Sequence, residues 1–279
     1  MSTLDRDLLD QLTQPGPRLR GIEDWLLNAV WTTDRFNECG SFPSSYLKSG
    51  EKLVNERETL LSSAADSIFD ELIASPASPV NISGFFSEHP DGGIVIFDGC
   101  SLRELPRLLD LAETSKRPVL SVCCARSAMP SSTEQFVGDR LGLKLPITGP
   151  SKLVQRHEFW DGFDLVWRNT VQAIPPNRTV LVTSDHGYVF LDAGLSDQNL
   201  EGKDRPLKGK RYRKFSEDEG LPENNPHIWV DRTRRIGAIK GRCHNRPQAP
   251  SASQSLYRHG GISLMEVLTP WLVLGPMEE

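Results

Sequence analysis

The chain has 279 residues, a net charge of −5 and 38% hydrophobic residues, which is typical of a globular protein and argues against wholesale disorder. Its length allows one large α/β domain or two small ones, and its negative charge does not favour a protein that coats nucleic acid. The acidic N-terminus, five cysteines without a C-x-x-C pair, and the lack of any stretch near the roughly 18 apolar residues of a spanning helix predict a cytoplasmic protein without membrane contact.

Residues 1–90 are expected to form a helical segment that packs on the core. Apolar residues recur at spacings of three and four in residues 4–12, 21–36 and 53–74, which is the period of an amphipathic helix. The clusters QPGP and CGSFPSS separate these stretches. The sequence gives no indication of what this segment does.

Residues 91–279 are expected to form an α/β core. The apolar runs GIVIFDG at 93–99, RPVLSVC at 117–123 and TVLVTSDHGYVF at 179–190 are typical of strands buried on both faces of a sheet. A helical pattern at 102–115 separates the first two, and residues 256–274 predict a Gly-Gly turn, a short helix and an apolar final strand. Strands that alternate with helices predict a mostly parallel sheet with helices on both faces, and such sheets bind ligands at the carboxyl ends of their strands.

A charged excursion without clear periodicity, at about 194–246, is expected to be a long loop close to the site. Its basic runs span residues 203–214 and 232–246, and the first of them places Lys210 near Tyr212. Cations interleaved with aromatic rings suit the phosphates and bases of a nucleotide or a single-stranded nucleic acid. Lys210 and Tyr212 are therefore candidate substrate ligands, and a solvated loop is the alternative.

Two of the expected strands end in carboxylates, Asp98 and Asp185. A charge at the end of a buried strand is costly unless it is paired or bound to a cation, and two charges at one sheet edge could share that cation. His186 follows Asp185 directly, and aspartate oxygen together with imidazole nitrogen suits Zn²⁺ or Mn²⁺. The alternative is an aspartate that caps a turn beside a surface histidine.

Four motifs, VIFDG, MPSST, TSDHGY and RHGGISLMEVLTP, occur in this order along the chain. Together they resemble the PglZ domain of the alkaline phosphatase superfamily, from roughly Gly93 to the C-terminus. SDHG occurs in many branches of the superfamily, whereas the HGG-x-S-x-x-E-x-x-x-P ending is particular to PglZ. The resemblance implies an alkaline-phosphatase-like fold, two divalent metal ions, usually zinc, and a metal-bound Thr or Ser that attacks phosphorus.

Carried over to this chain, the resemblance makes Asp98, Asp185 and His186 the ligands of the metal that also holds the nucleophile. It makes His259 a ligand of the other metal and Thr133 the nucleophile. Thr133 opens an expected helix, where the helix dipole and free N–H groups favour an alkoxide and an incoming phosphate. The alternative nucleophiles are nearby hydroxyls: Ser131, Ser132 and Ser101.

The second metal site departs from the family pattern. The superfamily places a D-x-x-x-H element before the SDHG strand, and here this stretch reads QRHEFWDGFDLVW. Asp161 is the first candidate ligand in it and His157 the next, in reversed order, with Asp164 three residues further on. The polar face of an amphipathic helix is the other explanation of these residues. If neither binds, the chain holds one metal or lacks activity.

These patterns favour a metal-dependent phosphoric ester hydrolase, in particular a phosphodiesterase acting on nucleotides or oligonucleotides. Arg103, one turn into the helix after Asp98, is expected to steady a phosphate oxygen. CCARSAMPSS lacks the C-x-P-x-R spacing of sulfatases, which disfavours sulfate esters. The resemblance implies partners in bacterial phage-defence systems of the BREX type or in signalling. The other function class is a non-catalytic or weakly active module that binds protein partners or nucleic acid.

Overall fold

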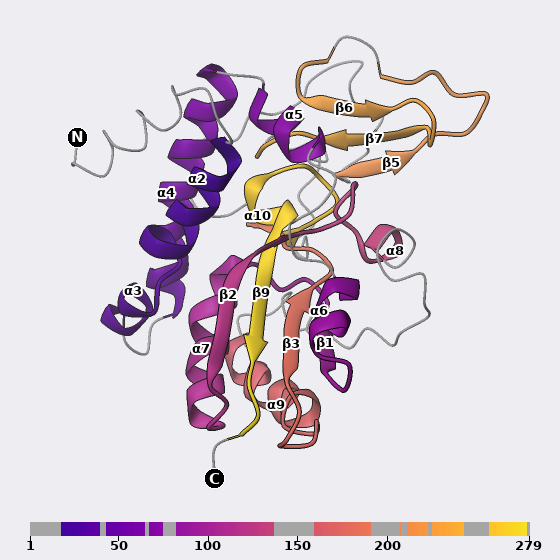
Figure 1. The fold of residues 1–279 in the computed structure, drawn as a ribbon. Coiled ribbons are helices and arrows are strands. Elements are labelled where there is room, and N and C mark those ends of the chain that lie inside the picture. Colours follow the sequence, from indigo (N-terminus) through magenta and orange to yellow (C-terminus); the bar gives the residue numbers. More distant parts are fainter. Residues whose placement is uncertain are drawn as a thin grey trace.

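The computed structural model describes residues 18–39, 43–64, 67–74, 82–136, 159–190, 207, 211–222, 225–242 and 257–277. At its centre lies a four-stranded mixed sheet (Figure 1). The strands lie in the order β1 (Gly93–Phe97), β3 (Val180–Ser184), β9 (Leu268–Leu274) and β2 (Val119–Arg126). All four coincide with apolar runs that the sequence predicts to be strands.

The sheet is less parallel than expected. β1 and β3 are parallel neighbours, whereas β9 is antiparallel to both β3 and β2. Three strands therefore share one direction, but two of the three neighbouring pairs are antiparallel. The cause is the short helix α10 (Leu264–Val267), which delivers the chain into β9 at the edge where β2 and β3 end. An apolar run reads the same in either direction, so the sequence pattern could not show this.

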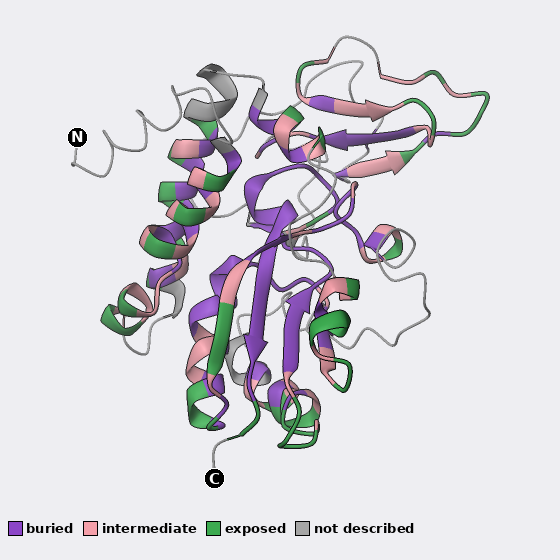
Figure 2. Ribbon diagram, viewed as in Figure 1, coloured by how far each residue is buried: buried purple, intermediate pink, exposed green. Residues whose placement is uncertain are grey.

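Helices cover both faces of the sheet, as predicted. Side chains alternate along a strand, and Val95, Val182 and Leu272 point to the face that packs on α7 (Leu105–Thr114) and α9 (Phe159–Thr170). On the other face, Leu181 and Trp271 pack with α6 (Ile82–Glu88). Figure 2 shows β3 and β9 buried along their whole length, whereas the first residues of the edge strand β2 are exposed.

The N-terminal helices differ from the predicted stretches at their boundaries. They are α2 (Arg18–Trp25), the π-helical turn η1 (Leu26–Val30), α3 (Thr33–Glu38), α4 (Pro43–Ala64) and α5 (Ser67–Ala74). The stretch at 21–36 breaks where the side chain of Thr32 caps α3. α4 begins earlier than predicted because proline is well accommodated at the first helical position. The predicted helix at 4–12 lies outside the described residues.

The described part of the 194–246 excursion contains a second sheet where the sequence predicts a long loop. Its three antiparallel strands lie in the order β5 (Tyr212–Lys214), β7 (Ile236–Ile239) and β6 (Ile228–Asp231). Each strand has only three or four residues, so a period of two cannot emerge from the charged residues around it. A further pair joins β4 (Val189–Phe190) to β8 (Tyr257–Arg258).

A buried arginine closes the end of the main sheet opposite the carboxyl ends of β1 and β3. The side chain of Arg117 is 1% exposed. Its guanidinium donates to four backbone carbonyls, those of Ile174, Pro175, Arg178 and Gly275. Arg117 thereby ties the end of β9 to the turn that precedes β3.

None of the described helices combines the length and the apolar character that crossing a membrane requires.

α4 also carries a buried carboxylate into the core. Glu58 is 2% exposed, and its Oε1 accepts a hydrogen bond from the backbone N–H of Leu264 at 2.9 Å. Among the residues that the structure describes, its Oε2 has no hydrogen-bond partner. Burial raises the pKa of Glu58 from an ordinary value of 4.5 to about 7, because the charged form is poorly solvated there.

We expect Glu58→Gln to gain stability relative to the wild type as the pH rises. A folded-state pKa above the unfolded value means that the wild type loses stability between pH 4.5 and about 7, whereas a glutamine has no proton to lose. The advantage of the variant should grow by roughly 2–3 kcal/mol between about pH 5 and pH 8. Urea denaturation at both pH values measures it. The control, Glu56→Gln on an exposed face of α4, should follow the wild type, and an equal pH dependence in both variants would contradict the prediction.

Candidate metal centre

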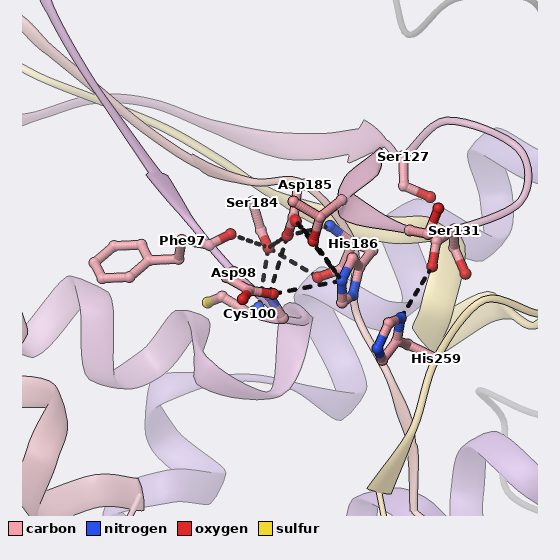
Figure 3. Close-up of polar contacts among 12 residues, drawn as sticks. Phe97, Asp98, Cys100, Ser127, Ser131, Ser184, Asp185, His186 and His259 are labelled. Carbon is pink, nitrogen blue, oxygen red and sulfur yellow. Dashed lines mark hydrogen bonds and ion pairs between the residues drawn. The ribbon is translucent and has the colours of Figure 1, made fainter. Parts of the chain in front are cut away.

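Two carboxylates and one imidazole meet where β1 and β3 end. Phe97 and Ser184 are paired in register at the ends of these parallel strands, so Asp98 and Asp185 emerge side by side. The Nε2 atom of His186 lies 3.5 Å from Asp98 Oδ1 and 3.6 Å from Asp185 Oδ2 (Figure 3). Ligand atoms from all three residues lie within 4.8 Å of one another. Within the described ranges, this is the one group of three or more such side chains that could hold a metal ion.

The ring of His186 is oriented by its own loop. Its Nδ1 lies 2.8 Å from the carbonyl oxygen of Gly187, so Nδ1 carries the proton and donates it. The other ring nitrogen, Nε2, faces both carboxylates. A ring held by one nitrogen at a backbone carbonyl, with the other nitrogen facing further donors, is the usual arrangement of a histidine that binds a metal. The donor set therefore fits a divalent cation of the zinc or manganese type.

Asp185 is fully buried, and its two oxygens face different partners. Oδ1 accepts hydrogen bonds from the backbone N–H groups of Gly99, at 3.1 Å, and His186, at 2.8 Å. Burial raises the pKa of Asp185, and the charge of Asp98 adds to this effect, whereas His186 and a hydrogen bond from Thr133 oppose it. A cation between the two carboxylates would offset both the burial and the repulsion.

Ser184 joins the loops that carry these residues. Its Oγ accepts a hydrogen bond from Cys100 N at 2.9 Å, and it lies 2.9 Å from Phe97 O and 2.8 Å from His186 O, to which it donates. The loop after β1 is thereby tied to the loop after β3 (Figure 3). The bridging role of Ser184 was not predicted from the sequence. A serine at the end of an apolar strand is the feature that could have indicated it.

Thr133 is the hydroxyl that the structure brings to the cluster. It is the first residue of the short helix α8 (Thr133–Phe136). Its Oγ1 donates to Asp185 Oδ2 at 2.5 Å and lies 3.4 Å from His186 Nε2. The predicted nucleophile thus lies against two of the three residues that could hold a metal.

The alternative hydroxyls have other partners. Ser131 Oγ donates to Gly261 O at 2.8 Å and accepts from Gly260 N at 3.1 Å. Ser101 Oγ donates to Glu104 Oε2 at 2.7 Å in a capping box. Ser132 Oγ accepts from the backbone N–H of Gln135 in α8. These contacts hold backbone in place and leave Thr133 as the better candidate.

His259 lies beside the cluster but outside its group of three. The pairing of β4 with β8 brings it next to His186, and the two rings stack with centroids 4.1 Å apart and planes 10° from parallel. Its Nδ1 lies 3.4 Å from Ser131 O. Burial, aided by the charge of His186, lowers the pKa of His259 to about 4, so the ring is neutral near pH 7. A neutral ring is the form that binds a metal.

A buried ion pair anchors the loop that carries His259. Glu266 accepts from Arg211 Nε at 2.6 Å and Nη2 at 2.8 Å, from Gly261 N at 2.9 Å and from Ser263 Oγ at 2.7 Å. The second Gly and the Ser of the HGG-x-S-x-x-E motif therefore both donate to its Glu. No sequence pattern marks Arg211 as part of this pair, because its partner is distant in the chain.

Arg103 does not lie where a substrate could reach it, which corrects the prediction that it steadies a phosphate oxygen. Its side chain is 1% exposed and forms an ion pair with Glu51 of α4. The position of Arg103 shortly after Asp98 correctly predicted that it lies near this edge of the sheet. The sequence could not show that Glu51, from the N-terminal segment, pairs with its guanidinium there.

The remaining predicted residues have mixed outcomes. The ring of Tyr212 packs on Gly260, where a Cβ would clash with it, and so lies next to the loop of His259. Lys210 and His157 lie outside the described residues. Asp161 is in the first turn of α9, and the structure describes its backbone but not its side chain. Asp164 forms an ion pair with Arg107 at 2.6 Å on the surface of the helix layer and not at the cluster.

The start of α9 nevertheless lies at the correct end of the sheet. Phe163 stacks on Phe97, the last residue of β1, with ring centroids 5.2 Å apart. The backbone of Asp161, half a turn earlier, is therefore near the edge that carries Asp98.

Comparison with known proteins returned no relative: neither a protein-family model nor a curated protein matches this chain. The motifs and the geometry of the cluster are therefore what indicate a function.

We expect Gly187→Ala to destabilise the protein by about 1–3 kcal/mol, the usual cost of an added methyl group in packed surroundings. A Cβ at Gly187 would clash with the carbonyl oxygen of Met265 and lie 3.0 Å from Ser101 Cβ. Gly220→Ala is the control, because nothing lies within 4 Å of its added methyl group. Urea denaturation of both variants measures the difference, and equal stabilities would show that the contact between Gly187 and α10 is not tight.

Proposed function

We propose that this chain is a metal-dependent phosphoric ester hydrolase, in particular a phosphodiesterase acting on nucleotides or oligonucleotides, with an alkaline-phosphatase-like fold of the PglZ type. The observation that carries the proposal is the position of Thr133, whose hydroxyl donates to Asp185 at 2.5 Å beside the Asp98, Asp185 and His186 group. A hydroxyl, a carboxylate pair and an imidazole at one sheet edge are the components of metal-assisted phosphoryl transfer.

In this proposal Asp98, Asp185 and His186 hold one divalent cation, zinc or manganese. When bound, the cation lowers the pKa of the Thr133 hydroxyl and offsets negative charge on the phosphate. A second cation is held by His259, with Asp161 and then His157 as the further candidates. His259 supports this role through its neutral ring and its stacking on His186.

The chain's own residues have separate roles in the reaction. Thr133 Oγ1 gives its proton to Asp185 Oδ2 and attacks phosphorus. The bond between phosphorus and the leaving oxygen breaks, and the leaving oxygen takes a proton from solvent. Asp185 and the N-terminus of α8 hold Thr133 in place for this attack. Water then attacks the phosphorus atom bound to Thr133 and loses a proton to solvent, a phosphate monoester is released, and Thr133 Oγ1 takes its proton back from Asp185. Burial of Asp185 and His186 keeps bulk water away from these groups.

The proposed substrate class depends on the segment around β5. Tyr212 packs against the loop of His259, and in this proposal its ring stacks on a nucleotide base. Lys210, two residues earlier, is proposed to contact a phosphate oxygen. Partners among phage-defence or signalling proteins remain part of the proposal through the resemblance to PglZ.

We expect the purified protein to hydrolyse bis-p-nitrophenyl phosphate in the presence of Zn²⁺ or Mn²⁺ and to lose this activity with EDTA. Thr133→Ala should lower kcat by at least about 10³-fold, because the attacking atom is missing. Thr114→Ala, an exposed threonine at the end of α7, is the matched control and should keep full activity. Full activity of the Thr133→Ala protein would refute the assignment of the nucleophile.

We expect metal analysis by mass spectrometry to find two ions per wild-type chain. Asp185→Asn should retain fewer, since it removes a ligand charge from the centre of the cluster. Asp164→Asn, whose aspartate pairs with Arg107 away from the cluster, should retain both. A finding of one ion per wild-type chain would contradict the proposed second cation at His259 and leave only the site formed by Asp98, Asp185 and His186.

The second candidate function is a non-catalytic or weakly active module that binds protein partners or nucleic acid. In the part of the chain that the structure describes, only one group of three donors could hold a metal, and this observation favours a site without a second ion. A protein that binds no metal near pH 7 and shows no turnover would make this second function the better one.

A further inference from the structure

Arg103 lies at the junction of the two loops that form the candidate metal centre. It belongs to the 3-10 helix η2 (Leu102–Glu104), which follows Asp98 closely along the chain. Its Nη1 donates to Ser101 Oγ at 3.0 Å and to the backbone carbonyl of Tyr188 at 2.7 Å. One guanidinium therefore bonds the loop after β1, which carries Asp98, and the loop after β3, which carries His186.

The bond to Tyr188 acts next to the group that orients His186. The peptide that joins Gly187 to Tyr188 includes the carbonyl that accepts from His186 Nδ1. Tyr188 is fixed at three points: its carbonyl bonds Arg103, its ring lies 4.4 Å from the guanidinium carbon, and its hydroxyl donates to Glu104. A rotation of the Gly187 carbonyl, and with it of the imidazole, would have to break these contacts.

The guanidinium itself is held by a carboxylate from a distant part of the chain. Glu51 of α4 accepts from Arg103 Nε through Oε1 and from Arg242 through Oε2, and its side chain is 1% exposed. Ion pairs buried to this degree add little net stability, because desolvation offsets the attraction between the charges. Removing one member nevertheless leaves a buried charge without its partner. The main effect of the pair is therefore to fix the orientation of the Arg103 guanidinium, and its contribution to stability is small.

We propose that the buried pair of Glu51 and Arg103 is a positioning unit for the candidate metal centre: it holds the loops after β1 and β3 at the separation and orientation in which Asp98, Asp185 and His186 face one another. This inference rests on the proposed metal-dependent function. Neither residue touches a metal ligand atom, so both act through Tyr188 and Ser101. It also gives the N-terminal helical segment, through α4, a role in the site.

Two variants test the unit. Arg103→Lys keeps the positive charge beside Glu51 but loses the planar fork that reaches Glu51, Ser101 and Tyr188 together. Glu51→Gln removes the charge that holds the fork. Each has a matched control of equal burial: Arg117→Lys at the opposite end of the sheet, and Glu58→Gln two turns further along α4. If Glu51→Gln does not fold, the charge-conserving variant Arg103→Lys tests the inference by itself.

The first readout is the affinity for Zn²⁺ and Mn²⁺ by titration calorimetry on the folded, metal-stripped full chain. We expect Arg103→Lys and Glu51→Gln to bind about 10–100-fold more weakly, as is usual when a group that orients a ligand is lost, and both controls to stay within about twofold of the wild type. Wild-type affinity in Arg103→Lys, in a protein whose wild type binds metal, would overturn the inference and leave the proposed function intact.

The second readout needs no metal. In protein labelled with ¹⁵N-histidine, the ring signals of His186 are identified by their loss in His186→Asn. We expect both test variants to shift these signals, because the Nδ1 hydrogen bond to Gly187 is loosened, and both controls to leave them in place. Unchanged His186 signals in Arg103→Lys would overturn the inference whether or not metal binds. Shifted signals in a chain whose wild type binds no metal would support the positioning role while the proposed function fails.

Discussion

The parallel, in-register pairing of β1 with β3 is the constraint on which the site depends. It sends Asp98 and Asp185 out of the sheet at the same edge, where burial and the neighbouring charge of Asp98 make the charge of Asp185 costly. The ring of His186, the hydroxyl of Thr133 and two backbone N–H groups offset part of this cost. The same features provide an arrangement that a divalent cation would complete.

Bonds between side chains and backbone groups fix the cluster. Ser184 bridges the loops after β1 and β3, and the carbonyl of Gly187 sets the ring of His186. Gly187 itself must be glycine because its backbone N–H bonds Glu266 O at 2.9 Å, too close to α10 for a side chain. The candidate site is therefore built on strand ends and on tightly packed turns.

Buried ion pairs link distant segments to this edge from two sides. Arg211 and Glu266 anchor the loop that carries His259, and Arg103 and Glu51 join α4 to the loops that carry Asp98 and His186. In each pair, the partners lie more than fifty residues apart in the chain. The N-terminal helices thus contribute to the organisation of the site as well as to the core.

The sequence alone determined the local features: the four apolar strands, the helices on both faces, and the strand-end residues Asp98, Asp185 and His186, because burial and turn chemistry leave periodic and short-range signals. Only the tertiary structure decided the antiparallel insertion of β9, the small sheet in the predicted loop, and the partners of Arg103. An apolar run carries no direction, a three-residue strand carries no period, and spacing in the chain cannot show which distant carboxylate meets a buried guanidinium.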